Sequence, residues 1–522
     1  MVKNNICKSF VFLAFAVLPA YFENKYFNML EAKWHAYVVG TSVLLAAAAI
    51  VWAAGRIGRP GAIELRTYEG APGEVRAGKL RTCEGTPGEV AAGKLRAGKS
   101  RRGRFNLMDA FVAGFGLCAA VSCMCSGQAA AAWAGTEGWH VGGFTIVTLV
   151  IWYFYLSRNM ELSSGVWLAV LLVNAVLLGM VVLHVAGVDA LFLHRGILES
   201  EYHSYLSTIG QMNWVVGYMS LVFPLYLGSY LGCTERVSAR IYEAFLLLCC
   251  MVMVLTASDG MYLAMGVMTL VIIPQACGQA VKLERCFRVV AMYGACLMMV
   301  AVLPIFASKR AVINGVSGFF VSVRVAAVVM LAGIAGAVLV RWLRPGKNTL
   351  RRLGVAAELG FGAFIVWCFV LTYRAFDMNW GTGRGRIWAS SFEIFGQLEW
   401  PRRLVGIGPE LLRDTYAGLE EFIGLPVYSS HSEPIQILLT MGAAGLAMWL
   451  GLWLCLAIGA VRRRMWREDG YVFLLSLAAY LGQSIVNSAT TTNVAMLIVI
   501  FACYRQALGG ESRRTRRTTG GS

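Results

Sequence analysis

Long apolar runs alternate with short polar connections along most of the chain. The runs have about 20 residues each, the length with which an α-helix crosses the hydrocarbon core of a bilayer. This pattern predicts an all-α polytopic membrane domain over residues 1–508, with about fourteen transmembrane helices. The predicted spans are residues 7–22, 36–55, 107–126, 139–156, 163–186, 213–232, 241–257, 260–280, 289–307, 318–340, 353–373, 435–461, 471–486 and 491–508.

The amino-acid composition leads to the same class of protein. Of the 522 residues, 58% are hydrophobic and only 14% are charged, whereas about a quarter of the residues in soluble domains are charged. A water-soluble fold is therefore excluded. The first apolar run ends in Leu18-Pro19-Ala20, and Leu18 does not suit a signal-peptidase site, which needs small residues. We expect this run to be a retained first helix.

The distribution of basic residues predicts the orientation in the membrane. A formal net charge of +17 would suit a nucleic-acid partner if the basic residues formed one surface patch. They occur instead in short clusters between apolar runs, as at Arg462, Arg463 and Arg464, which is typical of cytoplasmic loops. We therefore predict cytoplasmic N- and C-termini, a basic cytoplasmic tail at residues 509–522, contacts with membrane lipids and no nucleic-acid partner.

Residues 56–106 form a polar insert between two apolar runs. Within it, residues 65–99 hold a tandem repeat, LRTYEGAPGEVRAGK and LRTCEGTPGEVAAGK, followed by a shortened LRAGK. The repeat is rich in glycine and charge and too poor in apolar residues to bury a core, which predicts a disordered cytoplasmic insert. Two functions stay open for it: a duplicated linker, or a basic segment that binds lipid head groups or a partner.

Two predicted outer segments are long enough to have a function. The first, residues 187–212, contains His194, Arg195, Glu199, Glu201 and His203. The second, residues 374–434, is a large extracytoplasmic loop in which residues 386–400 show helical spacing and 409–423 suggest a second short helix. A loop this long among short connections is where catalytic and binding residues usually lie.

Three elements of the large loop are its most specific feature. They are GRGRIW at residues 383–388, GIGPE at 406–410, and HSEPIQILLTMG at 431–442, which continues to Gly445 in the next span. Their order resembles the O-antigen ligase family: an Arg before a Trp in an external helix, a GxG turn, then a His before a helix with a GxxG. The resemblance covers residues 210–455 and extends upstream to Asn213, Pro224 and Thr256-Ala257-Ser258-Asp259-Gly260.

This resemblance implies a fold and an activity. Members of the family are bacterial C-type glycosyltransferase-like enzymes of the cytoplasmic (inner) membrane. They ligate or polymerise glycans carried on undecaprenyl diphosphate, at the extracytoplasmic face, during cell-surface polysaccharide biosynthesis. The implied partners are an undecaprenyl-diphosphate-linked glycan donor and a glycan or lipid acceptor, and the implied reaction is inverting and metal-independent. Family members often have Ser-Arg-Gly where this chain has Ser258-Asp259-Gly260, so the resemblance does not carry over one possible phosphate contact of the family.

The chemistry of such a transfer assigns roles to the loop residues. A cation must offset the charge that grows on the leaving diphosphate, and Arg384 or Arg386 can bind phosphate oxygens in a fork. A base must take the proton of the acceptor hydroxyl, and His431 lies just before a predicted helix start, which disfavours its protonation. The alternative interpretations are that both arginines only solvate the loop and that His431 is an interfacial polar anchor.

Further charged residues complete the candidate substrate-binding set. Lys309 and Arg310 are positive residues on the predicted outer side, and Arg324 lies within an apolar run, where a charge is costly and often functional. Asp259 contacts the acceptor or caps a helix, and Glu433 lies in the acidic first turn after His431. The candidate set is therefore Arg324, Arg310, Asp259 and Glu433, beside the catalytic candidates His431, Arg384 and Arg386.

The sequence leaves alternative functions open. It has no Walker loop, no GxGxxG motif after a strand and no HExxH motif, so we expect neither a cofactor nor a catalytic metal. The principal alternative is a flippase or transporter of lipid-linked saccharides, which typically shows two related halves that are not evident here. A non-catalytic assembly protein of an envelope pathway is a third. Ligase and polymerase need the same two chemical roles and are not distinguished.

Overall fold

The computed structural model describes residues 2–57, 105–136, 138–161, 164–306, 315–419, 427–463 and 470–519. Helices make up almost all of this part of the chain, and one short antiparallel pair, β1 (Tyr205–Leu206) and β2 (Gly210–Gln211), is the exception. The first half consists of α1 (Val2–Phe12), the π-helical η1 (Leu13–Val17), α2 (Leu18–Ala20), α3 (Met29–Ile57), α4 (Leu107–Cys125), α5 (Ala129–Ala134), α6 (Gly143–Asn159), α7 (Ser164–Val185), η2 (Glu199–Ser204), α8 (Met212–Gly232) and α9 (Arg236–Thr256).

The second half carries the long loop of interest. Its elements are α10 (Asp259–Ala276), α11 (Ala280–Val302), η3 (Pro304–Phe306), α13 (Gly315–Phe320), α14 (Val323–Leu343), α15 (Lys347–Arg374), α16 (Trp380–Gln397), α17 (Trp400–Val405), η4 (Asp414–Tyr416), α19 (Glu433–Arg463), α20 (Tyr471–Ser484) and α21 (Thr491–Thr519). The tandem repeat at residues 65–99 lies outside the described residues, as do Lys309 and Arg310.

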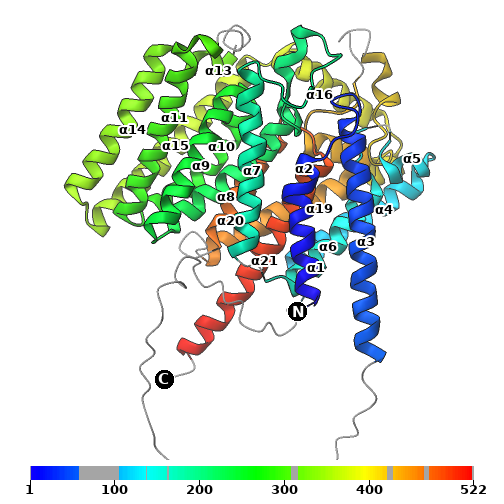
Figure 1. The fold of residues 1–522 in the computed structure, drawn as a ribbon. Helices are drawn as coiled ribbons and strands as arrows, with labels where there is room; N and C mark the ends of the chain where they lie inside the picture. Colours follow the sequence, from blue (N-terminus) through cyan, green and yellow to red (C-terminus); the bar gives the residue numbers. More distant parts are fainter. Residues whose placement is uncertain are drawn as a thin grey trace, which may run out of the picture.

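The prediction of an all-α polytopic membrane protein is confirmed. Twelve helices in the described part of the chain are long and apolar enough to cross a bilayer. Each of the fourteen predicted runs coincides with helix; the two runs beyond the twelve form α6, with 17 residues, and α20, with 14. In Figure 1 the N-terminus and the end of α21 lie at the same end of the bundle, and α16 lies at the opposite end. We call the end that bears α16 the site face.

α8 lies at the centre of the bundle. It is apolar on all sides and most of its residues are buried, as expected for a helix surrounded by other helices. α9 and α20 pack on it directly. At its polar positions hydrogen bonds are made inside the protein: Tyr218 donates to Asn174 Oδ1 at 2.5 Å, and Ser476 of α20 donates to the Leu221 carbonyl at 3.0 Å.

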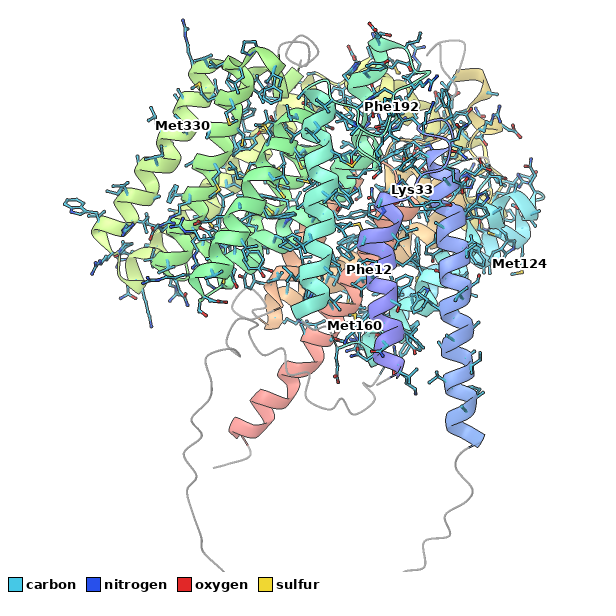
Figure 2. All side chains as sticks on the ribbon, in the orientation of Figure 1. Phe12, Lys33, Met124, Met160, Phe192 and Met330 are labelled. Atoms are coloured by element: carbon cyan, nitrogen blue, oxygen red, sulfur yellow. The ribbon has the colours of Figure 1, made fainter. Side chains whose placement is uncertain are left out.

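Small residues allow α11 and α14 to pack closely. A Cβ on Gly294 would collide with the backbone of Met330, and one on Gly333 would collide with Ala291. Close approach of backbones at such residues is a common way to join helices in membranes. Met330, labelled in Figure 2, lies in the outer part of the bundle, where α14 and α15 expose most of their apolar surface.

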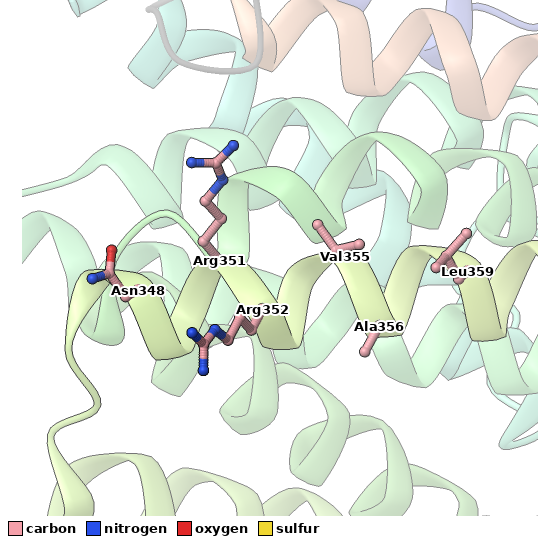
Figure 3. A pocket seen from close by; sticks show the side chains of 6 residues that line it. All are labelled: Asn348, Arg351, Arg352, Val355, Ala356 and Leu359. Atoms are coloured by element: carbon pink, nitrogen blue, oxygen red, sulfur yellow. The ribbon is translucent and has the colours of Figure 1, made fainter.

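Most of the basic residues of α15 lie at its N-terminal end. Figure 3 shows Arg351 and Arg352 extending in different directions from the first turns, while Val355 and Leu359 follow along the helix. Apart from Glu358 and Arg374, most of the remaining residues of α15 are apolar and exposed. A basic end followed by an apolar, uncovered surface is the pattern of a helix that faces lipid.

A break in α19 determines the geometry of the site face. The backbone of Gly442 is non-helical, with φ 67° and ψ −172°, so the helix bends there. The bend leaves carbonyl groups that the turn after α17 satisfies: Ile407 N–H donates to the Leu439 carbonyl at 3.0 Å, and Gly408 N–H to the Thr440 carbonyl at 3.0 Å. The hydroxyl of Ser122 on α4 also donates to the Thr440 carbonyl, at 2.6 Å. The GxG motif therefore pairs with the GxxG helix through the backbone.

Gly442→Ala tests this junction. The variant needs a backbone conformation that costs about 1–3 kcal/mol for a residue with a side chain, and its Cβ would collide with the Leu404 backbone. We expect a lower unfolding temperature in detergent and a smaller monodisperse fraction after size-exclusion chromatography. The matched control is Gly266→Ala in α10, where an added Cβ meets nothing within 4 Å. An unchanged unfolding temperature for Gly442→Ala would contradict this account.

Candidate functional site

α16 is held against the segment that precedes α19. The indole N–H of Trp388 donates a hydrogen bond to the Ser430 carbonyl at 3.0 Å. Arg384 lies one helical turn before Trp388, so both side chains lie on the same face of α16. The Nη1 of Arg384 donates to the Gly381 carbonyl at 3.1 Å, while its Nε is buried and makes no hydrogen bond within the described residues. The guanidinium is thus fixed beside residue 431 with one donor unused.

His431 occupies a constrained position at the start of α19. Its backbone has φ 49°, which is uncommon for a residue with a side chain, and its N–H donates to Ser429 Oγ at 3.0 Å. The imidazole meets the edge of Trp139, with ring centroids 5.8 Å apart at an angle of 75°. Burial, together with the positive charge of Arg384, lowers the pKa of His431 to about 4. The imidazole is therefore neutral at pH 7.

Asp259 acts on Arg384 through its negative charge. It begins α10 after a tight turn in which Ala257 has φ 49° and Ser258 Oγ donates to Asn213 Oδ1 at 3.3 Å. Burial lowers the pKa of Arg384, and the negative charge of Asp259 partly offsets this effect. Three of the predicted site residues, Asp259, Arg384 and His431, thus interact electrostatically, although Asp259 lies more than a hundred positions before the other two in the sequence.

The other predicted site residues are placed differently. Arg324 is exposed in the first turn of α14, which packs on α11, and Arg310 lies outside the described residues. The backbone N–H of Arg386 donates to the Met378 carbonyl at 3.0 Å, and its side chain is half-buried. Glu433 is buried, and its carboxylate accepts a hydrogen bond from Tyr480 at 2.5 Å rather than facing Arg384.

Glu410 is a buried acid that the sequence analysis did not single out. Its carboxylate accepts hydrogen bonds from the backbone N–H of Trp139 at 2.6 Å and from Gln436 Nε2 at 3.0 Å. Burial raises the pKa of Glu410 to about 7. Because Trp139 also contacts His431, Glu410 supports one wall of the site. The only signal in the sequence is its position directly after the GxG turn, in Gly408-Pro409-Glu410.

A buried polar segment, residues 487–493, is the second feature that the sequence analysis missed. It runs from the turn after α20 into the first residues of α21; its Ser488 hydroxyl contacts Ser429, and an added Cβ on Gly260 would touch the Asn487 amide. Irregular backbone within a membrane domain is tolerated only where protein or water surrounds it. The signal for it is the run NSATTTN, which interrupts apolar sequence near the C-terminus.

An apolar cavity of about 150 Å³ lies beneath this wall. Side chains of α4, α6, α19 and α21 line it, and Glu410, Glu433 and Gln436 form its polar end. The site therefore combines a neutral imidazole, a fixed guanidinium and a carboxylate at the site face with an apolar interior. A neutral imidazole can accept a proton, and a guanidinium can stabilise negative charge on an oxygen.

Glu410→Gln tests the buried acid. Between pH 4.5 and about 7 the wild-type carboxyl is protonated in the folded chain and ionised in the unfolded one. The contribution of Glu410 to the free energy of unfolding is therefore largest below pH 4.5, and it decreases by about 3 kcal/mol in total as the pH rises to about 7. The Gln variant does not ionise, so its stability does not decrease over this pH range. It lacks one hydrogen bond of the protonated carboxyl, which lowers its free energy of unfolding by about 1 kcal/mol.

We expect Glu410→Gln to unfold at a lower temperature than wild type at pH 5 and at a higher temperature at pH 8. Thermal unfolding followed by tryptophan fluorescence in detergent measures both. The exposed Glu399, changed to Gln, serves as control and should leave the difference near zero at both pH values. If the difference in unfolding temperature between Glu410→Gln and wild type were the same at pH 5 and pH 8, the pKa of Glu410 would not be raised.

Comparison with known proteins identified no relative of this chain. No protein-family model matches the chain, and no curated protein matches it.

Proposed function

We propose that the protein is a membrane glycosyltransferase that ligates or polymerises a glycan from an undecaprenyl-diphosphate carrier onto an acceptor at the extracytoplasmic face. The observation that carries the proposal is the neutral His431 beside the fixed, half-buried guanidinium of Arg384. The resemblance of the loop motifs to the O-antigen ligase family supports the same activity.

In the proposed reaction, the acceptor hydroxyl gives its proton to the imidazole of His431 as its oxygen attacks the anomeric carbon of the donor sugar. The bond between that carbon and the diphosphate oxygen breaks, with inversion. Undecaprenyl diphosphate leaves with the bonding electron pair, and Arg384 stabilises the negative charge that develops on it. Arg386 is the second candidate cation, from the same helix.

The surroundings of the pair suit this chemistry. Burial and Arg384 together keep His431 unprotonated at neutral pH, which is the form a general base needs. Asp259 adds negative charge near Arg384 and so helps to keep the guanidinium charged. In this chain an acid stands where family members often have an arginine, so we propose that Asp259 acts on Arg384 and not on phosphate.

His431→Ala tests the base. We expect transfer to fall by a factor of about 10²–10⁴, so that undecaprenyl-linked glycan accumulates in producing cells and the finished surface glycan disappears. His35→Ala, at an exposed position on α3, is the matched control and should leave both pools unchanged. Normal surface glycan in His431→Ala cells, with its loss on deletion of the gene, would favour a flippase or assembly protein instead.

Arg384→Gln tests the electrostatic coupling. Removal of the positive charge raises the pKa of His431 from about 4 towards the ordinary 6.5, while burial still holds it lower. Residual transfer activity, measured with purified protein in liposomes, should therefore decline at a higher pH on acidification than wild-type activity does. Arg402→Gln, at an exposed position in α17, should keep the wild-type profile. If the activity of Arg384→Gln declined at the same pH as that of wild type, Arg384 would have no influence on the protonation of His431.

A further inference from the structure

A second cluster of polar side chains lies at the site face, apart from the residues described above. His184 ends α7, Asp189 and His194 belong to the turns that follow, and one ligand atom from each lies within 4.8 Å of the others. His184 Nε2 is 3.5 Å from Asp189 Oδ1, and His194 Nδ1 is 3.5 Å from Asp189 Oδ2. Both imidazoles are more than nine-tenths buried, whereas the aspartate is 22% exposed and so open to solvent.

Hydrogen bonds fix the orientation of each member. The carboxylate of Asp189 accepts the backbone N–H groups of Leu193 at 2.9 Å and His194 at 2.8 Å, which hold it in place. His194 Nε2 lies 2.9 Å from the Tyr205 carbonyl, and since a carbonyl only accepts, the ring proton must be on Nε2. The Nδ1 lone pair of a neutral His194 therefore faces a carboxylate oxygen, an arrangement that requires a cation between them.

His184 supplies an independent observation. Its Nε2 is buried and has no hydrogen-bond partner among the described residues, although it is directed at Asp189. A histidine whose other ring nitrogen donates to a backbone carbonyl, as in His194, and a carboxylate fixed by hydrogen bonds are the usual supports of metal ligands. In a tetrahedral zinc site, ligand atoms at about 2.0 Å from the ion are about 3.3 Å apart. Here each imidazole lies 3.5 Å from a different oxygen of Asp189, and three ligand atoms, one from each residue, lie within 4.8 Å of one another, so the side chains need to draw together only slightly around an ion.

We propose that His184, Asp189 and His194 form a binding site for Zn²⁺ or a similar borderline divalent cation, with water as the fourth ligand. The ion would join the end of α7 to the turns before β1, and so fix the segment that leads into α8. It would have a structural role outside the proposed transfer reaction, and the proposal stands independently of that function.

The surroundings of His184 predict a moderate affinity. Without an ion, the Ser207 N–H donates to His184 Nδ1 at 3.1 Å, so the ring proton lies on Nε2. Zn²⁺ displaces that proton, and the ring stays neutral when Nδ1 carries a proton that Tyr26 Oη, 3.3 Å away, accepts. Because Ser207 then loses its acceptor, binding should be weaker than at sites with four protein ligands, and Tyr26→Phe should weaken it further.

The test uses the full chain, purified in detergent with an affinity tag that contains no histidine. The protein is stripped with a chelator, incubated with zinc chloride, desalted and analysed by elemental mass spectrometry. We expect wild type to retain about one Zn²⁺ per chain, and affinity to fall at least tenfold in His194→Gln and Asp189→Asn. His203→Gln, on the same outer segment but outside the cluster, should retain the wild-type amount. Equal retention by wild type and His194→Gln would overturn the proposal.

A second measurement keeps the proposal testable where the variants do not fold. Cobalt(II) added to stripped wild-type protein should give the intense visible absorption of tetrahedral coordination, and excess zinc should abolish it. A weak six-coordinate spectrum, or none, would overturn the proposal and leave a proton as the cation between His194 and Asp189.

Discussion

The break in α19 is the constraint on which the site depends. In a membrane, backbone groups released by a bend must find partners within the protein, because lipid offers none. Here the Gly406-Ile407-Gly408 turn supplies those partners, and the close approach requires that both Gly406 and Gly442 lack a side chain. Since α17 is thereby fixed to α19, the chain before it, including α16, is held near residues 429–431, where Trp388 makes its hydrogen bond.

The electrostatics of the site follow from this packing. Arg384 interacts electrostatically with an acid from α10 and with an imidazole from the start of α19, so each charge affects its neighbour. Burial alone would lower the pKa of both Arg384 and His431; the arginine adds to the effect on the histidine, and Asp259 opposes it on the arginine. The result is a pair in which Arg384 remains cationic and His431 is neutral at pH 7.

Much of this architecture could be predicted from sequence, for a physical reason. Apolar runs long enough to span a bilayer have one stable outcome, so all fourteen appear as helix. Arg384 and His431 were proposed from the loop motifs that resemble the O-antigen ligase family, because a motif and its spacing are local properties of a sequence. Glu410 and the polar segment at 487–493 were not singled out, because a buried carboxylate or amide can be recognised only from its partners, here Trp139, Gln436 and Ser429. Glu433 was assigned to the site from its place beside His431, but α19 turns it towards Tyr480.

The order of the site's parts along the chain has a consequence for biogenesis. Asp259 is synthesised long before Arg384 and His431, so the ribosome delivers the acid well ahead of the cation that faces it. The polar segment at 487–493 follows later still, and on its own it would be costly in lipid. It becomes buried when α20 and α21 enter together as a hairpin and α20 docks on α8 and α10. The insertion machinery must therefore hold α20 and α21 as a unit, and the site is completed only after both helices have left the translocon.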